Sequence, residues 1–154
     1  GIPTPIYVFA AVCIVAAITL KLTPFGRAIY AVGSNEEAAH LSGINVSLIT
    51  FGVYIIGGVL AALSGLIFLS RLSVGDPNSG LGLELEASTI AVIGGASLFG
   101  GVGTVIGTIG GAMVLAIIAN VLNLAGVSPF SQQVVKGAII ILAVLLEAGR
   151  KPRK

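Results

Sequence analysis

The chain has few charged residues and few of the side chains that commonly carry out chemistry. Its 154 residues include eight basic and six acidic ones, or 9% charged, against roughly 25% in soluble domains. Tryptophan is absent, and cysteine, histidine and methionine occur once each. This composition excludes a water-soluble globular protein, and the lone Cys13 excludes an internal disulfide. The basic C-terminal tail is too short to indicate a nucleic-acid partner, and we read it as an anchor on anionic lipid.

The residue sets of common catalytic and metal sites are also missing. The sequence has no Gly-x-x-x-x-Gly-Lys-[Ser/Thr] loop, so it does not bind ATP by that route. It has no Ser/His/Asp or Cys/His arrangement, and neither Cys13 nor His40 has a second metal ligand nearby. We therefore expect a protein that is not an enzyme and needs no metal or other cofactor.

The chain is instead rich in hydrophobic residues. Hydrophobic residues make up 56% of the chain, and the mean hydropathy is +1.09. Such a chain needs lipid around it, where only helices and closed barrels satisfy the backbone. Long uncharged runs favour helices over the alternating strands of a barrel. The sequence predicts an all-α polytopic membrane protein, one domain over residues 1–154, with about four to five transmembrane or re-entrant helices.

The uncharged runs give the positions of these helices. We predict spans over about residues 3–21, 46–70, 104–124 and 132–146. Residues 87–99 are short for a span and carry Gly94 and Gly95 in the middle, which favours a re-entrant segment, although a full crossing stays open. Because the first residue is Gly1 and the first span begins at once, we expect a segment of a longer protein.

The basic residues predict the orientation. If residues 26–45 and the C-terminus share one side, that side holds six of the eight basic residues, and the other side holds Arg71 and Lys136. The positive-inside rule then places the 26–45 segment and the C-terminus in the cytoplasm. Glu84 and Glu86 would lie at the outer mouth, and Lys136 near the outer interface as an anchor or structural residue.

The polar segment 26–45 is the most informative part of the chain. Ser34 and Glu37 have the spacing of a capping box, and Gly43 is a stop signal, which predicts one short helix between them. We expect Leu41 and Ala38 to face one way and Glu37 and His40 another. A helix this short needs support from the membrane or a partner. The residues alone leave two interpretations open: a docking surface for a soluble partner, or an ordinary solvated loop helix.

Four stretches closely resemble ribose-type sugar permeases of ABC importers, in the right order along nearly the whole chain. They are FGRAIYAVGSNEEAAHLSGINV (25–46), EASTIAVIGGASLFGG (86–101), NLAGVSP (123–129) and QQVVKGA (132–138). Such permeases are longer, and the resemblance is to their C-terminal half. It implies a transmembrane subunit of the cytoplasmic (inner) membrane that imports a small, ribose-like monosaccharide.

The resemblance also implies partners: a cytoplasmic ABC ATPase, an extracytoplasmic sugar-binding protein, and a second permease copy or the complementary half. Residues 26–45 would be the coupling loop that sits in a groove of the ATPase. The coupling residues would be Arg27, Ser34, Glu36, Glu37, Leu41 and Gly43. Two other functions stay open, namely half of a secondary transporter or channel that works without an ATPase, and a scaffold that oligomerises through its glycine faces.

Small and polar residues in the spans are candidates for the solute pathway. Glycine-broken helices commonly build transport sites, and carboxamides suit sugar hydroxyls. The pathway candidates are Gly94, Gly95, Ser97, Asn120 and Asn123. Close helix packing is the competing explanation for Gly94 and Gly95, and interhelical hydrogen bonding for the two asparagines. For Gly103, Gly107 and Gly111, at four-residue spacing, we predict helix packing.

Overall fold

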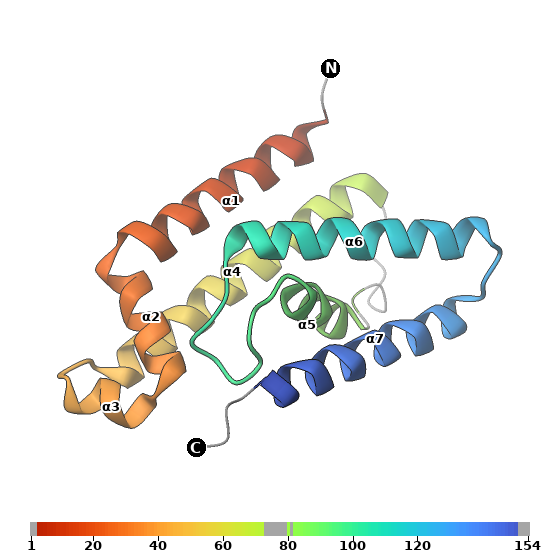
Figure 1. Ribbon diagram of the computed structural model, residues 1–154. Helices are drawn as coiled ribbons and strands as arrows, with labels where there is room; N and C mark the ends of the chain where they lie inside the picture. The colour runs from red at the N-terminus through yellow and green to blue at the C-terminus, as the bar shows by residue number, and fades with distance from the viewer. Residues whose placement is uncertain (1–2, 73–79, 81, 151–154) are drawn as a thin grey trace. The chain divides into compact units, whose positions relative to one another are not determined.

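The structure is a computed structural model that describes residues 3–72, 80 and 82–150 (Figure 1). The regular structure of these residues is entirely helical, which confirms the all-α prediction. The helices are α1 (Thr4–Leu22), α2 (Pro24–Ser34), α3 (Glu36–Leu41), α4 (Val46–Leu72), α5 (Leu83–Ile93), α6 (Val105–Leu124) and α7 (Pro129–Arg150). The chain divides into two compact units, Gly1–Gly80 with α1 to α4 and Leu81–Lys154 with α5 to α7.

Three helices in the described part of the chain are long and apolar enough to cross a membrane. They are α1, α4 and α6, each with a mean hydropathy of 2.2 over its most apolar stretch. In α7 a shorter apolar stretch covers Ser131–Leu142. The predicted spans agree with these helices to within a few residues, because uncharged runs bounded by charges or turn residues are a strong signal for spanning helices.

In the first unit, the chain turns sharply between α1 and α2 at Thr23. Pro24 cannot continue α1 but fits the first position of α2, where its missing N–H costs nothing. The Thr23 hydroxyl accepts a hydrogen bond from the Gly26 amide at 3.1 Å and donates one to the Thr19 carbonyl at 2.6 Å. Gly26 is buried at this turn, where a Cβ would collide with the carbonyl oxygens of Thr19 and Leu20. The turn therefore requires glycine at position 26.

The segment between α1 and α4 corrects the prediction of a single short helix. Most of it is α2, eleven residues long, which follows α1 after one extended residue. Only α3, six residues long, corresponds to the predicted helix. Helix α1 ends at Leu22, just before Thr23 and Pro24, and Pro24 and Gly26 then lie inside α2, because proline starts a helix as readily as it ends one.

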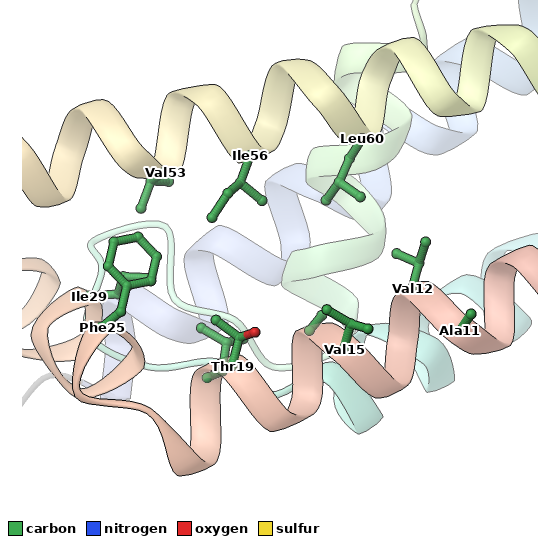
Figure 2. Close-up of a pocket in the computed structure, with 11 residues that line it drawn as sticks. Ala11, Val12, Val15, Thr19, Phe25, Ile29, Val53, Ile56 and Leu60 are labelled. Atoms are coloured by element: carbon green, nitrogen blue, oxygen red, sulfur yellow. The ribbon is translucent and has the colours of Figure 1, made fainter.

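An apolar groove of about 530 Å³ lies between α1 and α4, with α2 at one end. Figure 2 shows Val53, Ile56 and Leu60 of α4 directed across the gap toward side chains of α1. The ring of Phe25 in α2 closes that end, where it lies 3.1 Å from the position that a Cβ on Gly52 would take. Helix α2 contacts both long helices, and the groove between them is open to another apolar occupant.

In the second unit, α5 contacts both α6 and α7. Helix α5 has 11 residues, so its length is about 16 Å at 1.5 Å per residue, roughly half of a hydrocarbon core about 30 Å thick. It begins at Leu83, four residues before the predicted segment, and ends at Ile93, where Gly94 and Gly95 follow. This length agrees with the expectation of a partial span for this segment.

Candidate functional site

Helix α3 begins at an asparagine cap, which corrects the predicted capping box. The Asn35 side chain accepts a hydrogen bond from the Ala38 amide at 2.9 Å. Ser34, the predicted cap, is instead the last residue of α2. Serine and asparagine both favour cap positions, and the sequence places them side by side, so only the end of α2 decides which one caps α3.

The other end of α3 stops where the sequence indicates. Gly43 has φ of 83°, a left-handed conformation that glycine adopts at little cost. Its amide donates to the His40 carbonyl at 3.0 Å, and the Ile44 amide donates to the Ala39 carbonyl at 3.1 Å. The helix is therefore held at both ends by hydrogen bonds, which compensates for its short length.

One face of α3 is exposed, and its composition differs from the expected one. Ala39 is 4% exposed and faces the rest of the unit. Glu37 and Leu41, four residues apart, lie on one side of the helix opposite Ala39, and Leu41 is 81% exposed. The prediction that Glu37 and Leu41 lie on different sides is therefore wrong. Their shared face presents a carboxylate beside a large apolar side chain.

The remaining coupling candidates lie on the same unit as this face. Arg27 on α2 and Ser34 at its end are exposed, as is Glu36 in the first turn of α3. Helix α2 contacts α1, α3 and α4. Helix α3 also contacts α4 directly. We call the exposed surface of Arg27, Ser34, Glu36, Glu37 and Leu41 the α2–α3 surface.

The glycines of α5 and α6 form a close backbone contact. A Cβ on Gly94 would lie 2.5 Å from the Gly107 carbonyl oxygen and 2.7 Å from the Thr108 Cα. A Cβ on Gly107 or on Gly111 would collide with a carbonyl oxygen, that of Gly94 or of Ile90 respectively. Gly94, predicted as either pathway or packing residue, therefore lies in a packing contact. At Gly103 the nearest neighbour is the Ala96 Cβ, at 3.2 Å from the position of an added Cβ.

The loop from α5 to α6 is tightly folded. Gly95 has φ of 84° and ends α5, and Gly100 and Gly101 have φ of 90° and 76°. The Ser97 amide donates to the Val102 carbonyl at 2.9 Å, and the Ser97 hydroxyl accepts from the Phe99 amide at 3.1 Å. The Ser97 hydroxyl thus stabilises a turn. Whether it also contacts solute stays a prediction.

Asn120 and Asn123 are both exposed near the end of α6. The structure does not bring them together with Ser97 or with the α5 glycines, which lie toward the other end of α6. Among the polar residues of α5, the Ser88 and Thr89 hydroxyls donate to carbonyls one turn earlier, Glu84 at 2.8 Å and Leu85 at 2.6 Å. This back-bonding is the behaviour expected of hydroxyls in membrane helices.

The structure also joins two residues that the sequence analysis considered separately. The Lys136 ammonium of α7 lies 2.9 Å from the Glu86 carboxylate of α5, with the two side chains 24% and 32% exposed. The pair borders a cavity of about 260 Å³ that Thr89 and Gln133 also line. Gln133 is not among the residues that the sequence singles out as lining a site. The available signal was Lys136 itself, because an ionisable residue within a span usually has a partner.

Comparison with known proteins identifies the family. The family model for the permease component of branched-chain amino acid transport systems matches residues 2–144. The chain belongs to this permease family. The permease is 47% identical over 147 residues to the ribose import permease protein RbsC of Escherichia coli, a match that covers 96% of this chain and 46% of that protein. No solved structure gives a significant match.

Xylose permeases are nearly as similar to this chain in sequence identity as the ribose permease. The permease is 43% identical over 153 residues to the xylose transport system permease protein XylH of Haemophilus influenzae, covering 99% of this chain and 41% of that protein. The corresponding protein of Escherichia coli is 44% identical, with 39% of its length covered. The chain therefore spans less than half the length of these relatives. Family membership and the apolar helices agree in indicating a multi-pass membrane protein.

Proposed function

We propose that this chain is part of the transmembrane subunit of an ATP-driven importer of a small sugar, coupled to a separate cytoplasmic ATPase. Relatives named for ribose and xylose support a monosaccharide substrate. The chain lacks a phosphate-binding loop, so the energy has to come from a partner. The permease itself is then a transport subunit and not an enzyme.

One observation carries the coupling role: α3 presents Glu37 and Leu41 outward from a short helix fixed at both ends. An importer needs a stiff element that converts movement of the ATPase into movement of membrane helices. Leu41, 81% exposed, would fill an apolar pocket of the ATPase. The neighbouring Glu36, Glu37 and Arg27 would set the register by charge. Helix α2, which contacts α1 and α4, would transmit the movement.

The ion pair between Glu86 and Lys136 supports the proposed orientation. Glu86 lies in the first turn of α5, and Lys136 lies in the first half of α7. Their contact brings the first turn of α5 beside the first half of α7, and we infer that both helices begin toward the same side of the bilayer. If that side is outside, as the basic residues predict, α7 runs toward the cytoplasm and the C-terminus is cytoplasmic. A sugar-binding protein would then dock on the side where α5 and α7 begin.

The apolar groove of the first unit supports a further partner, the complementary half of the permease or a second copy. Its lining is aliphatic apart from Phe25 and Thr19, and it lies between two helices apolar enough to span a membrane (Figure 2). In lipid, association of helices depends on close packing and not on exclusion of water. A groove of about 530 Å³ offers such packing to another spanning helix.

Site-directed crosslinking tests the coupling role directly. In the assembled importer, with Cys13→Ser as background, Leu41→Cys should form crosslinks to the ATPase. Leu124→Cys is the matched control, since Leu124 is similarly exposed, at 84%, but is predicted to face outward. Crosslinks from position 124 and none from position 41 would contradict the proposal.

The alternative, half of a secondary transporter or channel, makes a different prediction. Proteoliposomes with the complete permease and without the ATPase would then accumulate sugar in response to an ion gradient, or equilibrate it passively. For the importer we expect uptake only when ATPase, ATP and binding protein are all present.

A further inference from the structure

The cavity between α5 and α7 combines charged, polar and apolar groups within one compact unit. It measures about 260 Å³ and is lined by Gly82, Leu85, Glu86, Thr89, Gln133, Lys136, Gly137 and Ile140. Pockets for drug-sized ligands are roughly 300–1,000 Å³ and mostly apolar with a few convergent polar groups. This cavity has the same mixture of apolar lining and a few polar groups, and its smaller volume suits a smaller solute.

The polar groups are the kinds that bind sugar hydroxyls. A carboxylate accepts up to about four hydrogen bonds, an ammonium donates three, and a carboxamide does both. The contact between Lys136 Nζ and Glu86 Oε1 uses one donor and one acceptor position of the pair. The Thr89 hydroxyl donates its hydrogen to the Leu85 carbonyl and the residue is buried, so Glu86, Lys136 and Gln133 supply the polar groups that a ligand can reach. The cavity thus retains both donors and acceptors for a polyhydroxylated ligand.

The cost of placing charge in a membrane domain argues for a function at this site. Ionisable residues in spanning segments are expensive, and they face one another or a water-filled cavity. Glu86 and Lys136 face one another as an ion pair, and both line the cavity. The pair borders the cavity, so its polar atoms are within reach of a ligand bound there.

We propose that this cavity is a contact site for the transported sugar, with Glu86, Gln133 and Lys136 as its principal polar groups. The inference rests on the proposed import function and adds a location for the substrate that differs from Gly94, Gly95, Ser97, Asn120 and Asn123. With the orientation given above, the cavity lies toward the outer side. A sugar released by the binding protein would meet it early in its passage.

Matched substitutions in the complete importer test the site. Glu86→Gln and Gln133→Leu should each lower ATP-driven uptake of D-ribose and D-xylose roughly tenfold, because the first replaces charge-assisted hydrogen bonds to the sugar by weaker neutral ones and the second removes hydrogen bonds altogether. The ATPase activity stimulated by the binding protein should persist, so that fewer sugars move per ATP hydrolysed. Glu84→Gln is the control, since Glu84 lies in the same first turn, is exposed and does not line the cavity.

A charge exchange separates sugar contact from simple pairing. The double variant Glu86→Lys with Lys136→Glu keeps an ion pair between α5 and α7 but moves the donor and acceptor within the cavity. We expect it to assemble normally and to transport poorly, with an altered ratio of ribose to xylose uptake. Full recovery of uptake with an unchanged ratio would assign the pair a structural role only and would overturn the inference.

Thiol labelling gives a second test that does not depend on transport. In a Cys13→Ser background, Gln133→Cys should react with a water-soluble thiol reagent, and saturating D-ribose should slow that reaction. Ser131→Cys, exposed on α7 and outside the cavity lining, should react at a rate that ribose does not change. Equal rates at position 133 with and without ribose or xylose would count against the site.

Failure of this inference differs from failure of the proposed function. If the unmodified importer shows no ATP-dependent sugar uptake, both the proposed function and the proposed sugar site are wrong. If the unmodified importer takes up sugar and the Glu86 and Gln133 variants do so equally well, only the site is wrong.

Discussion

The carbonyl oxygen of Gly94 lies so close to the Cα of Gly107 that a methyl group at position 107 would collide with it. This contact joins the end of α5 to the first turn of α6. Small residues allow such close approach between membrane helices, where van der Waals packing replaces the hydrophobic effect. We expect the half-length helix α5 to depend on this contact for its position beside α6.

Gly107→Ala should therefore destabilise the second unit. Overpacking of this kind costs about 1–3 kcal/mol, and here the obstructing atoms are backbone and cannot rotate away. Gly110→Ala on the same helix is the control, because an added Cβ there meets nothing within 4 Å. Thermal unfolding of the purified importer in detergent should show a lower midpoint for the first variant only. Equal midpoints for both variants would refute the packing role.

The cap of α3 gives a second prediction. Asn35→Ala removes the hydrogen bond to the Ala38 amide and should destabilise α3 by about 1 kcal/mol. Ser34→Ala should have little effect on α3, because Ser34 belongs to α2. Hydrogen exchange at the Ala38 amide should become about fivefold faster in the first variant. Faster exchange in the Ser34 variant alone would restore the capping box expected from the sequence.

The contact between Phe25 and Gly52 gives a third prediction. Gly52→Ala places a methyl group 3.1 Å from the ring of Phe25, which is too close and should lower stability by about 1 kcal/mol. Phe25→Leu should relieve the crowding, so the double variant should be more stable than the sum of the single effects. A double-mutant cycle on thermal stability measures this coupling, and strict additivity would mean that the two residues do not interact.

The charge at the α2–α3 surface gives a fourth prediction. Glu37→Lys should weaken binding of the ATPase, and added salt should reduce the difference from the unmodified protein, since exposed charges are screened within about 10 Å at 0.1 M. Leu41→Ser should weaken binding at every salt concentration, because its contribution is apolar. Binding of purified ATPase to the permease in nanodiscs measures both. The same salt response for the two variants would contradict the division of roles.

Much of the fold could be predicted because in lipid only helices and closed barrels satisfy the hydrogen bonds of the backbone. Uncharged runs located α1, α4 and α6 to within a few residues, and Gly43 marked the end of α3. The boundary between α2 and α3 could not be predicted, because Ser34 and Asn35 are both good caps. The outward face of α3 was also misjudged, since burial of Ala39 depends on α2 and α4 and leaves no local pattern in six residues.

The sequence by itself determined that the protein is a helical membrane protein, where its long helices lie, and to which family it belongs. These follow from hydropathy, breaker residues and motif order, all of which are local. The tertiary structure decided that Glu86 meets Lys136, fifty residues further along the chain, and that Gly94 packs on Gly107. Such pairings depend on how α5 packs against α6 and α7, and no local preference of the chain encodes that packing.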